Sequence, residues 1–414
     1  MLIRAIALAK RVAPLALAEA VSRLVGFGVL AVAARTLGAD GVGIFTLGQT
    51  VAQYAATGTD LGLKSIGARL VAQGRAAPAM LVSAVQSKRA LLAFAAAAAV
   101  ALYALLGPVP SEARGFVLVY GLSVIPLAFS LDWVLWGSER FGALGVWRTG
   151  IAVAWFCLSL VVLLSPSPPL AGLAGANAVA QLVGVIALWL TLRRRPSRAT
   201  ADATQVAMAT RWSEVGWLGL ATFVNQAFHT FGVIMLAALA TAREVGFFAA
   251  AYKLVFLLLG AYWLVTQALY PRLAQRQQGS EATALVGRLA LGGLALGLAF
   301  AAVVWPLADW AIRVAYGDGF ERAAAVLRVL LIALPLDFVA SLLGTAFTAW
   351  GWARRLSFAT VAGTAVNVLG NAWAIPAYGA TGAAWVTIAA YLVLLLILIG
   401  MLVVEHSKRR DRAG

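Results

Sequence analysis

Long runs of apolar residues recur along the whole chain, separated by short segments that carry most of the charges. An α-helix of roughly 20 such residues crosses about 30 Å of hydrocarbon. The runs are continuous, unlike the alternating segments of a membrane barrel, so they suit helices. The pattern predicts an all-α membrane protein with twelve transmembrane helices, at residues 13–34, 42–63, 90–107, 115–136, 142–165, 169–192, 213–240, 246–270, 288–306, 324–349, 356–375 and 381–404.

Composition supports this interpretation and leaves no room for a sizeable soluble domain. Hydrophobic residues make up 62% of the 414 positions and charged residues 12%, whereas charged residues alone supply about a quarter of a soluble domain. Cys157 is the only cysteine, and His229 and His406 are the only histidines. We therefore expect no disulfide framework, no metal site and no cofactor, with H⁺ or Na⁺ as the ions that could bind.

The basic residues define an orientation. If the N-terminus is cytoplasmic, 24 of the 32 lysines and arginines fall in cytoplasmic segments or at their edges, and five fall on the opposite face: Arg35, Arg114, Arg243, Arg313 and Arg322. This asymmetry is what the positive-inside rule predicts for twelve spans, and it places both termini in the cytoplasm. It also explains the net charge of +16 as attraction to anionic membrane lipids, so we expect no nucleic-acid partner.

The second half of the chain repeats features of the first. Val42 to Phe45 reads V-G-I-F, and Val245 to Phe248 reads V-G-F-F. Six helices in each half give parallel repeats with the same orientation, which is a transporter plan with the substrate path between the halves. We expect two six-helix bundles at residues 1–202 and 203–414, joined by a polar linker at 193–211.

Three further local features carry structural predictions. Pro126 and Pro335 are expected to interrupt the fourth helix of each half. Gly293 and Gly297, spaced as GxxxG, permit close helix packing. The segment 64–89 mixes basic and apolar residues and is expected to lie along the cytoplasmic membrane surface.

Two motifs resemble a known family. A-A-R-T-L-G-A-D-G-V-G-I-F (residues 33–45), followed by T-D-L-G-L (59–63), resembles the opening motif of polysaccharide transporters and O-antigen flippases. A-I-P-A-Y-G-A-T-G-A-A (374–384) resembles the stretch before the last helix in that family, which belongs to the multidrug/oligosaccharidyl-lipid/polysaccharide (MOP) exporter superfamily.

The resemblance implies a bacterial inner-membrane flippase with a MATE-like fold. Its substrate would be an undecaprenyl-pyrophosphate-linked oligosaccharide, moved to the periplasmic leaflet by alternating access for surface polysaccharide biosynthesis. Its partners would be this lipid-linked substrate, membrane lipids, and a polysaccharide polymerase with its export machinery.

Two other functions remain open. Multidrug extruders share the twelve-helix plan, so the alternative is an ion-coupled exporter of organic cations. A membrane-embedded glycosyltransferase or polymerase is disfavoured by short periplasmic segments. The sequence also has no Walker A, H-E-x-x-H or G-x-S-x-G motif, so we expect a transporter and not an enzyme.

Ionisable residues at membrane depth are functional candidates because they are costly there. Basic groups suit a pyrophosphate, and the candidates are Arg23, Lys253, Arg328, Arg148 and Lys64. Each also has a structural interpretation. Glu19 can neutralise Arg23 from one turn away, Arg148 and Lys64 can extend to the headgroups, and Lys253 or Arg328 can pair with Asp337 or Asp60.

Carboxylates suit ion coupling, and the candidates are Glu19, Asp132, Asp337 and Asp60, although Asp60 also suits a turn. Uncharged polar candidates for the cavity are Asn225, Gln226, His229, Asn367 and Asn371. A histidine can titrate near neutral pH, but a hydrogen bond to a neighbouring helix is the better explanation of a lone membrane histidine such as His229.

Overall fold

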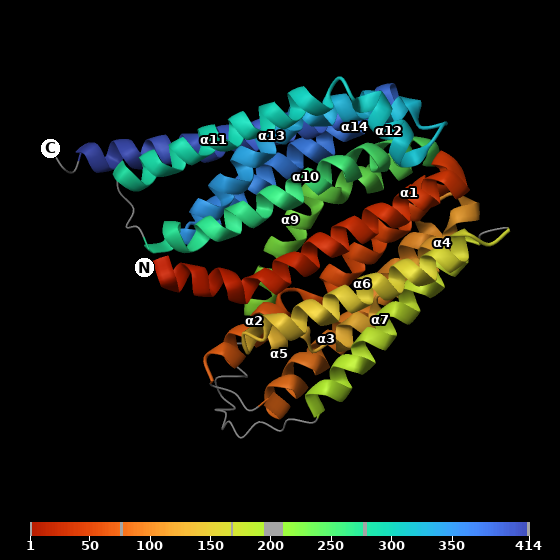
Figure 1. Ribbon diagram of the computed structural model, residues 1–414, viewed down its shortest axis with the longest axis horizontal. Helices are drawn as coiled ribbons and strands as arrows, with labels where there is room; N and C mark the ends of the chain where they lie inside the picture. Colours follow the sequence, from red (N-terminus) through yellow and green to blue (C-terminus); the bar gives the residue numbers. More distant parts are fainter. Residues whose placement is uncertain (1, 75–77, 167–168, 194–209, 276–279, 412–414) are drawn as a thin grey trace. The chain divides into compact units, whose positions relative to one another are not determined.

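The structure is a computed structural model that describes residues 2–74, 78–166, 169–193, 210–275 and 280–411, and within them it contains helices and no strands (Figure 1). The helices are α1 (Leu2–Asp60), α2 (Leu63–Ala72), α3 (Pro78–Leu106), α4 (Ser111–Leu122), the 3₁₀ helix η1 (Ile125–Phe129), α5 (Asp132–Gly137), α6 (Phe141–Leu163), α7 (Leu170–Arg193), α9 (Trp212–Leu239), α10 (Ala242–Gln275), α11 (Ser280–Val304), α12 (Ala308–Tyr316), α13 (Glu321–Ala349) and α14 (Ala353–Asp411).

Nine segments of the described residues are long and apolar enough to span a membrane. Two of them, Ala13–Asp60 and Ala353–Glu405, have 48 and 53 residues. A straight helix of 48 residues would measure about 70 Å, more than twice the hydrocarbon thickness. Each is in fact two helices joined at a kink. With the 34-residue α10, the described residues form the predicted twelve spanning helices.

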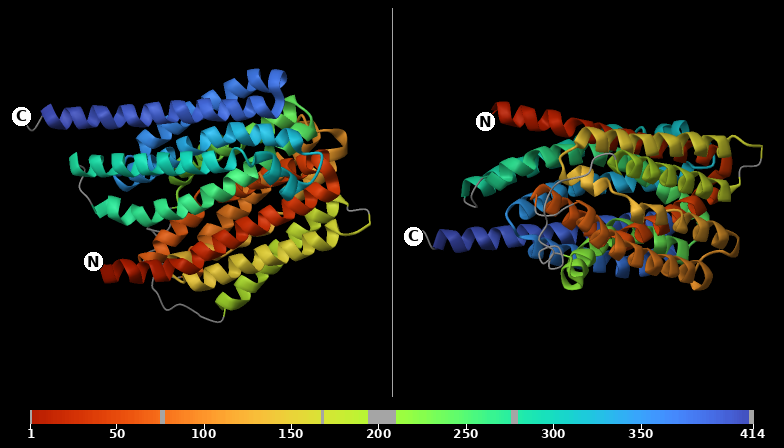
Figure 2. Two further views of the ribbon diagram at one scale, coloured as in Figure 1. Left: turned by 45° about the horizontal axis from the view of Figure 1, so that its top comes forward. Right: turned by 90° about the horizontal axis from the view of Figure 1, so that it is seen from below.

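Glycines make both kinks. Gly38 in α1 has φ +67°, and Gly379 in α14 has φ +56°. This left-handed conformation costs a side-chain-bearing residue free energy that glycine avoids. Figure 2 shows α14 folding back on itself at its kink. Its two arms pack closely, because a Cβ atom on Gly370 would lie 2.9 Å from the Val386 side chain.

The chain forms two compact units. The first comprises residues 1–37 and 44–223, and the second comprises 38–43 and 224–414. The second unit therefore includes a six-residue segment from the first loop of the chain. The expected division between residues 202 and 203 lies outside the described residues, as does most of the expected linker.

The segment 64–89 packs into the protein core of the first unit, so the prediction that it lies along the membrane surface is wrong for its apolar side. Leu81 and Val85 are fully buried, and they belong to a cluster with Leu63 and Trp133. A short helix gains more by burying this side against α5 than by facing lipid headgroups, since packed side chains also gain dispersion contacts.

The two prolines behave differently. Pro126 lies in η1, where the fourth helix of the first unit is broken as expected. Pro335 lies inside the continuous α13, so the expected interruption there is wrong. In the second unit α13 packs against α10, α11 and α14 (Figures 1 and 2), and such neighbours permit a proline within a membrane helix. A Cβ atom on Gly297 would lie 2.5 Å from the Pro335 Cα atom, which confirms close packing at this glycine.

Candidate functional site

An ion pair links Lys64 on α2 to Asp132 on α5 in the first unit. Lys64 Nζ lies 3.1 Å from Asp132 Oδ1 and 3.2 Å from Oδ2. The Ser130 hydroxyl donates a second hydrogen bond to Oδ1 at 2.7 Å. Asp132 is buried, whereas the Lys64 side chain is 25% exposed. The pair therefore satisfies a buried carboxylate, while part of the Lys64 side chain stays exposed.

Arg89 is a second charged residue of this region, and its side chain is 1% exposed. Its guanidinium donates to the backbone carbonyls of Ser130 at 2.8 Å and Leu127 at 2.6 Å. These carbonyls follow the break at Pro126, and each accepts a second hydrogen bond: Leu127 from the Ser130 backbone N–H at 3.1 Å and Ser130 from Gln86 Nε2 at 3.4 Å. Arg89 Nε also lies 3.7 Å from Asp60 Oδ1. The guanidinium thus holds the broken fourth helix against the end of α1.

Asp60 also forms the turn between α1 and α2. Its carboxylate accepts hydrogen bonds from the backbone N–H groups of Gly62 at 3.3 Å and Lys64 at 3.1 Å. Gly62 has φ +83° and is followed directly by the first residue of α2. The D-L-G-L motif thus acts locally by closing this turn and placing Lys64 in the first turn of α2, beside Asp132.

The sequence did not identify Arg89 as a site residue. It was assigned to a cytoplasmic segment, because the third helix was expected to begin at residue 90, whereas α3 begins at Pro78. The sequence did contain one signal for Arg89. Gln86 lies four residues after Val82 and three before Arg89, so a helix that includes Val82 places the polar Gln86 and Arg89 on one face. In the structure Gln86 accepts a hydrogen bond from Arg89 at 3.2 Å.

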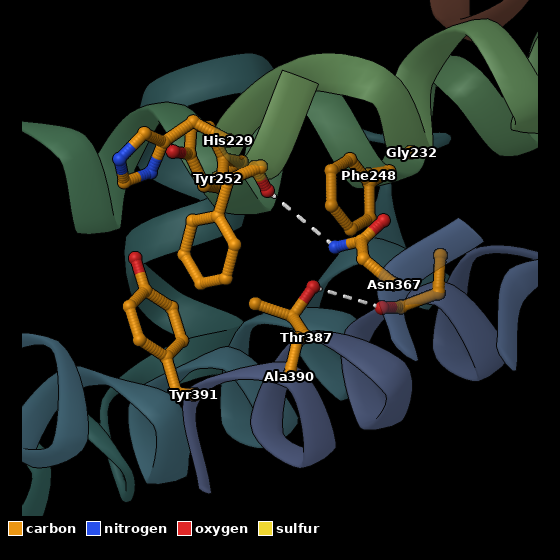
Figure 3. Close-up of a pocket in the computed structure, with 10 residues that line it drawn as sticks. His229, Gly232, Phe248, Tyr252, Asn367, Thr387, Ala390 and Tyr391 are labelled. Carbon is orange, nitrogen blue, oxygen red and sulfur yellow. Dashed lines mark hydrogen bonds between the residues drawn. The ribbon is translucent and has the colours of Figure 1, made fainter. Parts of the chain in front are cut away.

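The second unit contains a pocket between α9, α10 and α14 (Figure 3). Its cavity volume is about 20 Å³, room for one water-sized group, and it is lined by Phe228, His229, Gly232, Phe248, Tyr252, Asn367, Ala383, Thr387, Ala390 and Tyr391. Aromatic rings cover one side, and amide and hydroxyl groups face the other. The pocket is therefore suited to a small polar ligand or ion and is too small for a glycan.

Asp337 lies behind this pocket on α13 and is 7% exposed. Its carboxylate accepts a hydrogen bond from the Ser341 hydroxyl at 3.1 Å, and Tyr391 contributes to its electrostatic environment. It also interacts electrostatically with His229. In Figure 3 the Tyr391 hydroxyl points toward the side of the pocket where His229 lies. The structure thus brings together one predicted coupling carboxylate and one predicted polar residue.

Two asparagines of α14 form a hydrogen-bonded pair, of which Asn367 lines the pocket. Asn371 Nδ2 donates to Asn367 Oδ1 at 2.8 Å, and Asn367 Nδ2 donates to the Phe228 carbonyl at 3.5 Å. Both residues are buried, and Asn371 Oδ1 has no hydrogen-bond partner in the described part of the chain. Of the predicted residues, His229 and Asn367 therefore line the pocket, and Asn371 is hydrogen-bonded to Asn367.

Two predicted substrate-binding arginines have carboxylate partners. Arg23 Nε lies 3.0 Å from Glu19 Oε1, one helical turn earlier in α1. Arg328 on α13 pairs with Asp309 on α12, and not with Asp337 or Asp60 as considered from the sequence. These pairs reduce the positive charge available to an anionic substrate at both positions.

The remaining predicted residues are dispersed. Lys253 on α10 places its ammonium group 5.9 Å from the centre of the Phe256 ring. Arg148 on α6 is partly buried and forms no ion pair with a described carboxylate. Asn225 is exposed, and Gln226 donates to the Thr230 hydroxyl at 2.9 Å. These residues do not join the pocket.

Comparison with known proteins identifies the family. The model of a family described as polysaccharide biosynthesis protein matches residues 8–277, about two thirds of the chain. The chain belongs to this family. No curated protein has significant sequence similarity to it.

Solved structures of MOP transporters share the fold. The lipid II flippase MurJ in an inward closed conformation has a TM-score of 0.71 and 12% identity, with 93% of this chain and 86% of that chain covered. An inward-facing multidrug resistance MATE transporter has a TM-score of 0.70 and 14% identity, with 95% and 96% covered. A MOP superfamily transporter from Pyrococcus furiosus has a TM-score of 0.61 and 16% identity, with 97% and 95% covered.

These findings confirm the resemblance read from the loop motifs and the all-α fold of twelve helices. The polysaccharide biosynthesis family and the MOP fold are established for this chain by the family match and the structural similarity together. At 12–16% identity the solved structures carry no information on its substrate.

Proposed function

We propose that this member of the polysaccharide biosynthesis family is a flippase for undecaprenyl-pyrophosphate-linked oligosaccharide, working by alternating access in the bacterial inner membrane with both termini cytoplasmic. The observation that carries the proposal is the family match over residues 8–277 in a chain built of twelve spanning helices. A membrane protein of polysaccharide synthesis whose described residues lie mostly in membrane-length helices is suited to moving an intermediate across the membrane.

The charges of the first unit support an anionic headgroup. Lys64 is 25% exposed and is held by a buried carboxylate, so a pyrophosphate that approaches it can share the ammonium group with Asp132. Arg148 is partly buried on a spanning helix and has no carboxylate to neutralise it among the described residues. We propose Lys64 and Arg148 as the leading substrate contacts, with Lys253 as a third.

A gene knock-out with complementation tests the function. We expect the knock-out to lose surface polysaccharide and to accumulate undecaprenyl-pyrophosphate-linked oligosaccharide in the inner leaflet. Wild-type protein restores export, and Arg148→Gln restores it poorly. Arg140→Gln is the matched control, because Arg140 is exposed and precedes the same helix. Normal export by the knock-out, together with no glycolipid movement in reconstituted vesicles, would overturn the proposal.

Ion-coupled export of organic cations is the second candidate. The observation in its favour is Asp337, a buried carboxylate beside a pocket lined by Phe228, Phe248, Tyr252 and Tyr391. Aromatic faces and a carboxylate attract cations. Cells that express the protein would then tolerate cationic dyes better than cells that express Asp337→Asn. If neither strain tolerates the dyes better than cells without the protein, this candidate is excluded.

Coupling to protons or sodium is compatible with either substrate. We propose Asp337 with His229 as the coupling site in the second unit, because the buried Asp337 interacts electrostatically with His229, which lines the pocket. Glu19 and Asp132 are occupied by Arg23 and Lys64, and Asp60 closes a turn. These three carboxylates are therefore weaker coupling candidates.

A further inference from the structure

The segment Gly38–Gly43 makes an unusually close contact with the start of α10 within the second unit. A Cβ atom on Gly43 would lie 1.7 Å from the carbonyl oxygen of Ala242. A Cβ atom on Gly246 would lie 2.1 Å from the carbonyl oxygen of Ala39. Neither distance is sterically possible, so both positions require glycine for this approach.

The four residues are related by the internal repeat. Ala39 and Ala242 are separated by 203 positions, as are Gly43 and Gly246. The same offset aligns V-G-I-F with V-G-F-F. Gly43 thus meets Ala242, the repeat equivalent of Ala39, which lies four residues before Gly43. In the same way Gly246 meets Ala39, the repeat equivalent of Ala242, which lies four residues before Gly246. This reciprocal pattern is the signature of a contact on a two-fold axis, where residue i meets j and the copy of j meets the copy of i.

A third pair lies on the axis itself. Asp40 and Arg243 are also separated by 203 positions, and Arg243 Nε lies 3.7 Å from Asp40 Oδ2. Equivalent residues meet each other only at a two-fold axis, and identical charges there would repel. The repeats carry opposite charges at this one position, so the contact is attractive. Both side chains are well exposed, so the pair contributes little stability and is open to reagents.

The α10 side of the contact is anchored. Glu244 Oε2 accepts a hydrogen bond from the Ala380 backbone N–H at 2.8 Å, and Oε1 lies 2.9 Å from Arg322 Nη1. These bonds tie the start of α10 to α13 and to the kink of α14. The other side begins at Gly38, whose φ of +67° is a conformation that glycine adopts without strain and whose Cβ position meets no atom within 4 Å. We therefore take the segment Gly38–Gly43 as the partner that moves when the contact opens.

We propose that Ala39, Asp40, Gly43, Ala242, Arg243 and Gly246 form a two-fold clasp between the sequence repeats, closed in this structure, which opens during transport. The clasp is a gate on the side that the orientation of the charges assigns to the periplasm. The inference rests on the proposed alternating access, but not on the identity of the substrate. A two-fold clasp, unlike an ordinary loop contact, requires that Gly43 and Gly246 have equivalent roles, so that the same substitution at either glycine has the same effect.

The test uses the full chain in lipid nanodiscs with Cys157 replaced by serine. Asp40→Cys and Arg243→Cys are combined and treated with a short bifunctional thiol cross-linker, and spin labels at the same positions report the distance. We expect rapid cross-linking and a short distance. Gly43→Val and Gly246→Val should each reduce the cross-linking rate at least tenfold and shift the distance to longer values. Gly292→Val is the control, because a Cβ atom there meets no atom within 4 Å.

Cross-linking unaffected by either valine, or affected by only one of them, overturns the two-fold clasp. The gate role has a separate test in reconstituted vesicles, where the cross-linked protein should lose transport and a cleavable cross-linker should restore it after reduction. Normal transport by cross-linked protein overturns the gate while leaving the proposed function intact. Failure of the untreated protein to move lipid-linked oligosaccharide contradicts the proposed function, whereas the distance measurements still decide the clasp.

Discussion

Lys64 and Asp132 stand 68 positions apart in the sequence, and their charged groups lie 3.1 Å apart in the first unit. From the sequence, Lys64 is a candidate substrate contact and Asp132 is a candidate coupling carboxylate. Their proximity means that neither can be tested alone, because removing one leaves the other charge without its partner in a mostly buried position. Double mutants separate the two roles.

Lys64→Ala is expected to lower the free energy of unfolding by about 3 kcal/mol, because it strands the buried Asp132 carboxylate. Lys64→Ala with Asp132→Ala should recover much of this loss, since no unpaired charge remains. Thermal denaturation in detergent measures both. If Lys64 also contacts the substrate, the double mutant is stable and still inactive in export. A double mutant that is stable and fully active limits Lys64 to a structural role.

Arg89→Ala should be more damaging, at about 3–5 kcal/mol, because it leaves Asp60 without its ion-pair partner and removes the guanidinium hydrogen bonds to the Ser130 and Leu127 carbonyls. Arg89→Lys should rescue little, since an ammonium group cannot reach both the Ser130 and Leu127 carbonyls in the geometry of the guanidinium fork. Folded yield and thermal stability of the two variants provide the measurement. Wild-type stability of Arg89→Lys would show that charge alone suffices at this position.

Asp337→Asn keeps the size of the side chain and the hydrogen bond from Ser341, so we expect a change in stability within about 1 kcal/mol. Transport by this variant should no longer respond to an imposed proton or sodium gradient. Ser341→Ala serves as the control, because it removes one neutral hydrogen bond of about 1 kcal/mol and retains the carboxylate. Gradient-dependent transport by Asp337→Asn would exclude Asp337 from coupling.

Gly67→Ala should destabilise the first unit by about 1–3 kcal/mol through overpacking. A Cβ atom at Gly67 would lie 2.6 Å from the buried Trp133 ring, which has no room to move within its apolar cluster. Gly142→Ala is the matched control, since nothing lies within 4 Å of its Cβ position. That change should be neutral or slightly stabilising, because alanine favours a helix. Equal melting temperatures for the two variants would contradict the packing argument.

The sequence by itself determined the class of the fold, the number of spanning helices and the family. These features are written in local patterns: the length of an apolar run sets a membrane crossing, and short loop motifs mark the family. The GxxxG packing at Gly297 was also readable, because a small residue on a helix face needs only one neighbour to be useful. The break at Pro126 was readable for the same reason.

Only the tertiary structure decided which charges meet. Whether Arg328 pairs with Asp309 or Asp337, and whether Arg89 faces water or the carbonyls after Pro126, depends on contacts between helices that are far apart in the sequence. Pro335 lies in an unbroken helix because α11 presents Gly297 beside it. Local composition sets what each segment is, but the free energy of a buried charge depends on its partner, and that partner is chosen by packing.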